Sequence, residues 1–285
     1  MQPLFEHRLT LGGFETRALE LEGDGPPLLL LHGWADSADT WRPLLDRLGR
    51  VDRRALAVDM PGFGTAAPPS DGEPLLPQLD AFCEAALEYA GPDRGAVVVG
   101  NSLGGCVALR AAERPELGLS GVVPVAPAGL DMARWLVIVE RDPIVRWLLA
   151  SPVPLPGPVV SAAVAEAYRR LAFRRPRSVD PRVVSTFASH LSSKKDAARV
   201  LAIARRLLPE LRDCFRLERI SCPVMLVWGR QDRLVFQTGA ERVVEAAADA
   251  RIELIDDCGH CPQLECPERL HELLVDFPAR LARAA

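Results

Sequence analysis

The chain has 285 residues, of which 48% are hydrophobic and 25% charged, and its net charge at pH 7 is −4. This size and balance predict one large soluble domain with room for an inserted lobe. The negative charge argues against general nucleic-acid binding. The longest apolar runs, LLLL at residues 28–31 and WLVIV at residues 135–139, are far shorter than the roughly 18 residues of a membrane helix. We therefore expect no nucleic-acid partner and no integral membrane association.

The N-terminal sequence and the cysteines indicate the cellular compartment in which the protein is expected. The opening MQPLFEHRLT lacks the basic head and apolar run of an export signal. The seven cysteines are scattered and odd in number, which does not suggest a disulfide framework. We expect a cytoplasmic protein that is a monomer or a homodimer.

The first half of the chain alternates between extended and helical patterns. Strands are expected at residues 5–11, 15–21, 26–33, 95–100 and 121–127, and within RALAVDMPGFG at residues 54–64. Helices are expected at residues 39–50, 79–89 and 103–115. This order predicts an α/β fold with a mostly parallel, doubly wound sheet and helices on both faces.

The alternation stops after Pro127. Residues 130–217 are rich in arginine and helical in pattern, and strand and helix signals resume after them at residues 222–229, 241–248, 251–256 and 267–281. We predict a core of residues 1–129 and 218–285, with a helical insertion of residues 130–217 after the sixth strand. The arginines are interpreted as solvated helix faces; a surface for acidic substrates or membranes is the alternative.

The clearest chemical signal is the segment Gly100-Asn101-Ser102-Leu103-Gly104, which fits the pattern G-x-S-x-G. Small residues two positions before and after the serine let the backbone turn sharply from a strand into a helix. Ser102 is the predicted nucleophile. The N–H of Leu103, at the N-terminus of the helix, is a predicted oxyanion donor. The alternative is a glycine-rich turn with an incidental serine.

A nucleophilic serine needs a base, and the base needs an anion that orients it. His260 is the one histidine of five in a loop that directly follows a predicted strand, at the carboxyl edge of the sheet. Asp232 follows another strand at the same edge. We predict a catalytic triad of Ser102, His260 and Asp232. Asp131 is a reserve for the acid, and Asp256 and Asp257 are less favoured because they lie too close to His260 along the chain.

Five motifs in this order resemble the α/β-hydrolase fold superfamily over nearly the whole chain. They are HGW at His32, DMPGFG at Asp59, GNSLGG at Gly100, GRQD at Gly229 and CGHCPQLE at Cys258. The order serine, aspartate, histidine is also that of the superfamily. The resemblance implies the α/β-hydrolase fold and makes the helical insertion a cap over the active site. It also implies that the N–H of Trp34 is the second oxyanion donor and that Asp59 holds a turn.

The segment CGHCPQLEC, residues 258–266, raises the alternative of a metal site. Zinc prefers about four ligands in a tetrahedron, and this stretch offers Cys258, His260, Cys261 and Cys266. The adjacency of His260 and Cys261 makes joint ligation awkward, and the triad already requires His260. We therefore expect no metal and no organic cofactor, and small buried thiols rather than a Cys258/Cys261 redox pair.

The predicted activity is hydrolysis of a small-molecule carboxylic ester with a small to medium apolar acyl group. The alternative enzyme is a C–C bond hydrolase of vinylogous diketones, whose members also read GNS at the elbow but differ after HG and CGH. A third possibility is a non-catalytic receptor for a small ligand on the same fold.

Candidate substrate contacts are fewer and less specific. His32 and Asn101 are predicted either to touch substrate or to tie down loops. The aromatic residues Trp34, Trp135, Trp147 and Phe173 are candidates for an apolar acyl pocket, with plain packing as the alternative.

Overall fold

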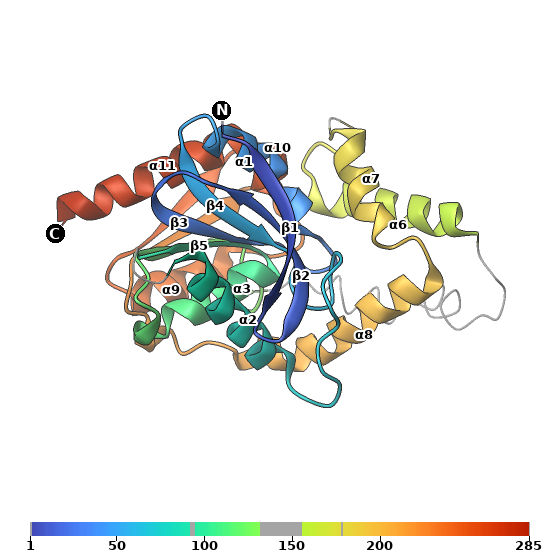
Figure 1. Ribbon diagram of the computed structural model, residues 1–285, viewed down its shortest axis with the longest axis horizontal. Helices are drawn as coiled ribbons and strands as arrows, with labels where there is room; N and C mark the ends of the chain where they lie inside the picture. The colour runs from blue at the N-terminus through green and yellow to red at the C-terminus, as the bar shows by residue number, and fades with distance from the viewer. Residues whose placement is uncertain (1, 92–94, 132–155, 178, 285) are drawn as a thin grey trace.

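An eight-stranded sheet forms the centre of the molecule (Figure 1). The computed structural model describes residues 2–91, 95–131, 156–177 and 179–284. The strands are β1 (Leu4–Leu11), β2 (Phe14–Leu21), β3 (Asp24–Leu31), β4 (Arg53–Val58), β5 (Val97–Asn101), β6 (Gly121–Val125), β7 (Val224–Gly229) and β8 (Ala250–Ile255). Their order across the sheet is β1-β2-β4-β3-β5-β6-β7-β8. The pairs β1/β2 and β2/β4 are antiparallel and all others are parallel, which confirms the predicted fold class.

Helices cover both faces of the sheet, and a layer of buried apolar side chains lies between the sheet and the helices on each face. Alternate residues of the central strands enter different layers: Val98 packs with α2 and α3, while Val97 and Val99 pack with α1 and α11. Burial on both faces explains why these strands read as continuous apolar runs in the sequence. The helices of the core are α1 (Arg42–Leu48), α2 (Leu75–Ala90), α3 (Leu103–Ala112), α9 (Ala240–Ala246), α10 (Pro262–Glu265) and α11 (Pro267–Ala284). Short 3-10 helices lie at Ala38–Trp41, Pro115–Leu117, Leu211–Asp213, Leu217–Arg219 and Gln237–Gly239.

Among the described residues, three further helices lie between β6 and β7. They are α6 (Gly157–Ala172), α7 (Pro181–Ser189) and α8 (Lys194–Glu210). Figure 1 shows α6 and α7 to one side of the sheet, with α8 running back towards the core. Residues 132–155 of the predicted helical insertion lie outside the described residues. None of the described helices is long and apolar enough to cross a membrane.

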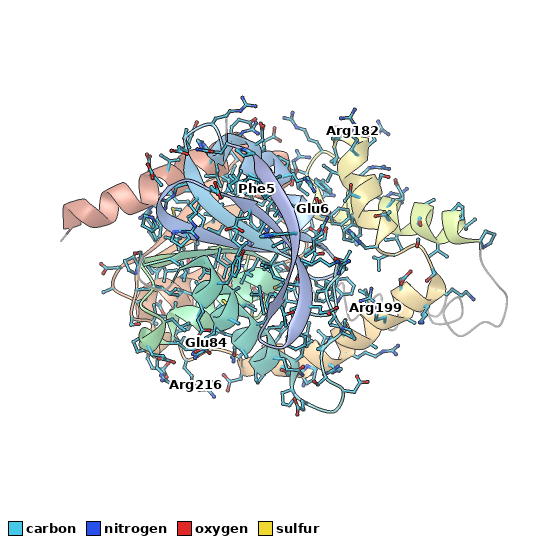
Figure 2. All side chains as sticks on the ribbon, in the orientation of Figure 1. Phe5, Glu6, Glu84, Arg182, Arg199 and Arg216 are labelled. Atoms are coloured by element: carbon cyan, nitrogen blue, oxygen red, sulfur yellow. The ribbon has the colours of Figure 1, made fainter. Side chains whose placement is uncertain are left out.

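Polar contacts of α8 fasten it to the core. The Glu210 carboxylate accepts the N–H groups of Leu75 and Leu76 at 2.8 Å each, so it satisfies backbone donors at the start of α2. Arg199, labelled in Figure 2, donates to the carbonyl of Gly62, and Arg206 donates to that of Ser70 at 2.6 Å. These two arginines of α8 therefore bind loops of the core.

The turn from β5 into α3 depends on glycine at two positions. A Cβ on Gly100 would lie 2.1 Å from the Gly104 carbonyl oxygen, and a Cβ on Gly104 would lie 2.2 Å from the Leu31 carbonyl oxygen. Both contacts are with backbone, which cannot rotate away. Between these glycines Ser102 has φ 53°, a left-handed conformation that a side chain seldom adopts.

Substitution of Gly104 tests how strongly the fold depends on this turn. We expect Gly104→Ala to lower the free energy of unfolding by about 3 kcal/mol or more, or to prevent folding, because α3 must move away from β3. Gly49→Ala is the matched control, since its Cβ would meet its nearest atoms at 3.4 Å. Urea denaturation should separate the two variants, and equal stabilities would contradict the steric argument.

Candidate functional site

Ser102 lies at the turn between β5 and α3 and lines a cavity. Its N–H donates to the Val125 carbonyl at 2.8 Å, and its carbonyl accepts the N–H of Ala128 at 3.0 Å. These bonds fix the strained backbone against the end of β6. Leu103 is the first residue of α3, so its N–H has no carbonyl one turn earlier in the helix to bind.

His260 and Asp232 meet at the carboxyl ends of β8 and β7. The Nδ1 of His260 lies 2.7 Å from Oδ2 of Asp232, and the Asp232 side chain is only 2% exposed. The other oxygen, Oδ1, accepts the N–H groups of Leu234 at 2.7 Å and Val235 at 3.1 Å. Because the Asp232 carboxylate accepts a hydrogen bond from Nδ1–H, the proton stays on Nδ1, and Nε2 is the ring nitrogen that can accept another proton.

The other acids considered from the sequence have different partners. Asp131 accepts a hydrogen bond from the Thr238 hydroxyl. Asp256 accepts from Arg230 at 2.6 Å, and Asp257 accepts from Arg175. Asp232 is the acid that the structure brings to His260.

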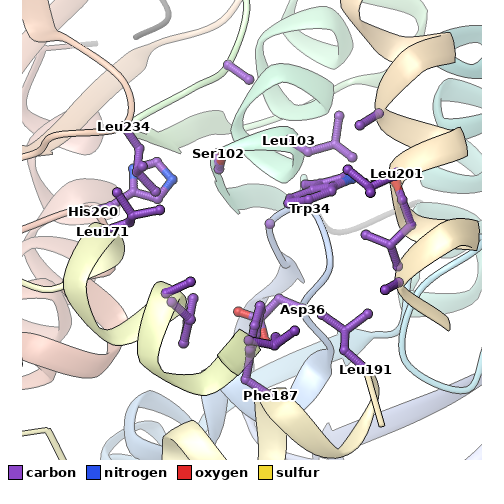
Figure 3. Close-up of a pocket in the computed structure, with 18 of the residues that line it drawn as sticks. Trp34, Asp36, Ser102, Leu103, Leu171, Phe187, Leu191, Leu201, Leu234 and His260 are labelled. Carbon is purple, nitrogen blue, oxygen red and sulfur yellow. Dashed lines mark hydrogen bonds between the residues drawn. The ribbon is translucent and has the colours of Figure 1, made fainter. Parts of the chain in front are cut away.

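A mostly apolar cavity of about 470 Å³ opens beside Ser102 and His260. Figure 3 shows these two side chains near each other at one end of it. The volume falls in the range of small-molecule sites, about 300–1,000 Å³. Much of the wall comes from the inserted helices: Val159, Val160, Ala163, Val164, Ala167, Tyr168 and Leu171 of α6, and Lys194, Ala197, Val200, Leu201, Ala204, Leu207 and Leu208 of α8.

The loop of Gly33 and Trp34 forms part of the cavity wall beside Ser102 and the start of α3. Trp34 and Leu103 both line the cavity, and Figure 3 places them close to Ser102. The Trp34 indole N–H donates to the carbonyl of Val200 at 3.3 Å, which ties this loop to α8. A Cβ on Gly33 would lie 3.4 Å from that of Ser102, so the loop approaches the serine closely.

His32 does not appear among the described residues that line the cavity. It is 0% exposed; its Nε2 accepts the N–H of Met60 at 2.8 Å and its Nδ1 donates to the Gly33 carbonyl at 2.7 Å. Burial lowers the pKa of His32 to about 4, which keeps the ring neutral and able to accept at Nε2. Its contacts tie two loops together.

The remaining predicted contacts divide between the cavity and the packed interior. Asn101 lines the cavity, and its amide donates to the carbonyls of His260 at 3.0 Å and Val125 at 3.3 Å. Phe173 is 1% exposed and packs edge-on against Tyr168. Trp135 and Trp147 lie outside the described residues.

Asp59 is a buried acceptor for three segments. Its carboxylate accepts from the N–H of Ala38 at 2.8 Å, the N–H of Thr65 at 2.9 Å and Nε of Arg17 at 3.2 Å. Its side chain is 0% exposed. These bonds hold the turn that follows β4.

A buried polar chain behind the cavity is missed by the sequence analysis. The Gln263 amide donates to Asn101 and to the Thr40 hydroxyl, at 3.2 Å each, and the Thr40 hydroxyl binds the carboxyl of Asp36. Asp36 also lines the cavity. The sequence gives only weak signals for these residues, because glutamine and threonine carry no motif and the contact between Gln263 and Thr40 joins residues 223 positions apart.

The cysteines around His260 bind other side chains. Cys258 forms a hydrogen bond with Cys266, and Cys261 lies 3.7 Å from the Tyr168 hydroxyl. Burial raises the pKa of Cys261 well above its usual range. Among the described residues, no three His, Cys, Asp or Glu side chains are arranged to hold a metal ion.

The fold and this constellation define an α/β hydrolase, and comparison with known proteins agrees. The model of the alpha/beta hydrolase family matches residues 28–273. The chain belongs to this family.

Two curated proteins and one solved structure illustrate what the chain is similar to within this family. The pimeloyl-[acyl-carrier protein] methyl ester esterase of Xanthomonas campestris pv. campestris (strain B100) is 31% identical over 92% of this chain and 99% of its own length. The human monoacylglycerol lipase ABHD6 is 25% identical over 90% of this chain and 76% of its own. Among solved structures, the 2-hydroxy-6-oxo-6-phenylhexa-2,4-dienoate hydrolase of Rhodococcus sp. strain RHA1 has a TM-score of 0.78 at 20% identity, covering 97% of this chain and 99% of that one.

Replacement of Asp232 tests its pairing with His260. In Asp232→Asn the amide keeps the shape but no longer offers a negatively charged acceptor to Nδ1, so we expect kcat to fall by about 1,000-fold or more with little change in KM. Asp256→Asn is the control, because that exposed carboxylate pairs with Arg230. Steady-state ester hydrolysis measures both, and a normal kcat for Asp232→Asn would contradict the assignment.

The buried Asp36 carboxyl predicts a dependence of stability on pH. Burial raises the pKa of Asp36 to about 7, from an ordinary 3.8 in the unfolded chain. Between these values the folded state binds the extra proton, so the free energy of unfolding falls as pH rises from about 4 to about 7. In Asp36→Asn the side chain cannot ionise, so the variant does not lose this stability as pH rises. We expect the melting temperature of the variant, relative to wild type, to increase from pH 5 to pH 8; parallel pH profiles would contradict it.

Proposed function

We propose that this protein is a serine hydrolase that cleaves carboxylic esters with a small to medium apolar acyl group. The observation that carries the proposal is the 2.7 Å contact between His260 Nδ1 and Asp232. This contact leaves Nε2 of His260 free to act as a base, and both His260 and Ser102 line the same apolar cavity. A serine hydroxyl becomes a nucleophile when such a base removes its proton.

The reaction runs through an acyl-enzyme on Ser102. His260 takes the hydroxyl proton as Oγ attacks the ester carbonyl carbon, and the backbone N–H groups of Leu103 and Trp34 bind the resulting oxyanion. His260 then gives the proton to the departing alkoxide, which leaves as the alcohol. Water, deprotonated by the same histidine, then attacks the acyl carbon. The bond from that carbon to Oγ breaks, His260 returns the proton to Oγ, and the carboxylic acid leaves. Asp232 stabilises the charged imidazolium in both halves, and the reaction needs no metal or organic cofactor.

The inserted residues 130–217 act in this proposal as a cap on a core of residues 1–129 and 218–285. Two of the inserted helices, α6 and α8, supply apolar side chains to the cavity wall. This wall excludes water from the acyl chain and recognises it by burial of apolar surface. Trp135 and Trp147 belong to the same segment and are proposed to contact substrate there.

The relatives support an ester rather than a C–C substrate. An esterase is the relative at 31% identity, and a lipase stands at 25% over most of the chain. The dienoate hydrolase is similar at 20% identity, and a likeness at this level supports the shared fold but not a shared substrate. A purely ligand-binding role has no such relative among these. The cytoplasmic location and the monomeric or homodimeric state stay predictions from the sequence.

A series of p-nitrophenyl esters from acetyl to palmitoyl tests the proposal. We expect kcat/KM to rise from acetyl to a medium-chain ester, because a longer acyl chain buries more surface against α6 and α8. Ser102→Ala should lose about 10⁴-fold or more in kcat. Turnover by the variant at the wild-type rate would rule out Ser102 as the nucleophile; a folded wild-type protein inert towards every ester would rule out the substrate class.

A further inference from the structure

The loop that carries His260 is attached to the inserted segment where α6 ends. The backbone N–H of His260 donates to the carbonyl of Ala172, the last residue of α6, at 2.7 Å. Ala172 and Phe173 are each 1% exposed, so this contact lies in the packed interior. The predicted general base is therefore bonded through its own backbone to a helix of the insertion.

Glu265 adds a second attachment at the same place. One carboxylate oxygen, Oε1, accepts the N–H of Gly259 at 2.8 Å, and the other, Oε2, accepts the N–H of Arg174 at 2.8 Å. Gly259 precedes His260, and Arg174 lies two residues beyond the end of α6. A single carboxylate thus binds the His260 loop with one oxygen and the α6 end with the other.

The fit between these two segments is close. A Cβ on Gly259 would lie 2.6 Å from the Ala172 carbonyl oxygen and 2.7 Å from both the Arg174 nitrogen and Oε1 of Glu265. The Tyr168 hydroxyl of α6 also lies 3.7 Å from Sγ of Cys261, the residue after His260. The His260 loop therefore has little freedom to move unless the end of α6 moves with it.

The same helix forms a wall of the cavity. Val160, Val164 and Leu171 of α6 line the space beside Ser102, and Figure 3 shows Leu171 next to His260. The wall that an acyl chain would contact and the loop that carries the general base are parts of one bonded unit.

We propose that Glu265 is a positioning residue, which holds His260 in register with Ser102 by bonding its loop to the end of α6. This inference rests on the proposed function, since it assigns His260 the role of general base. Glu265 touches no reacting atom. Its effect passes through the backbone of Gly259 and His260, and small displacements of a catalytic group are enough to slow a reaction strongly.

Glu265→Gln tests the proposal with little change in volume. The amide has one oxygen that accepts and an NH2 group that only donates, so it cannot accept both N–H groups. We expect kcat per active site to fall about ten- to hundredfold. KM should stay within about twofold, because the cavity wall is unchanged. The fall should be the same for an acetyl and a medium-chain ester, since the base serves both.

Two further variants sharpen the test. Gly259→Ala forces the same segments apart by a different route and should show the same loss of kcat. Glu166→Gln is the control: Glu166 lies on α6, pairs with Arg169 and Arg170, and does not line the cavity, so its kcat should be that of wild type. Titration with a fluorophosphonate counts the active sites of each variant, and the melting temperature shows that the variant is folded. Each kcat is then expressed per active site.

The outcomes separate the positioning role from other roles. Wild-type kcat per active site in both Glu265→Gln and Gly259→Ala would overturn the proposal. A rise in KM for the medium-chain ester alone would also overturn it, because it would mean that Glu265 only shapes the pocket. If Ser102→Ala is inactive while Glu265→Gln and Gly259→Ala are both normal, the positioning role fails and the hydrolase function stands. An active Ser102→Ala instead removes the proposed function itself.

Discussion

The structure depends on one steric constraint, the close passage of the backbone at the turn between β5 and α3. Gly100 and Gly104 leave no room for a Cβ at this turn, and Ser102 between them takes a left-handed conformation. The parallel sheet then places the other two residues. Strands β7 and β8 run in the same direction as β5, so their carboxyl ends bring Asp232 and His260 to the same edge of the sheet as Ser102. The three residues of the proposed triad therefore lie on three loops that the sheet brings to one edge.

His32 and Asn101, two buried polar residues near the cavity, each have defined hydrogen-bond partners. The neutral ring of His32 donates to the carbonyl of Gly33 and accepts from the N–H of Met60, which fixes the loop beside Ser102. Asn101 donates to the carbonyl of His260 from the other side. The pairing of these side chains avoids the free-energy cost that each would carry if it were buried without a partner.

Much of this was accessible from the sequence. Apolar runs predict the strands, and G-x-S-x-G followed by loops with Asp232 and His260 predicts the central constellation, because these signals are local and in chain order. The exact starts of helices such as α2, which begins at Leu75 rather than near residue 79, were less accessible. The polar chain through Gln263, Thr40 and Asp36 and the attachment of Glu265 to Arg174 could not be predicted, since each joins distant segments without a motif. Burial of Asp36 likewise emerges only when the chain is folded.

Covalent labelling with a fluorophosphonate tests the central claim, an activated serine at the turn between β5 and α3, most directly. The intact protein would be treated at neutral pH, digested, and its peptides analysed by mass spectrometry. The account predicts one adduct per chain, located on Ser102 and lost when the protein is unfolded before treatment, because activation needs His260 and Asp232 in place. An absent adduct in folded protein, or an adduct on another residue, would contradict it.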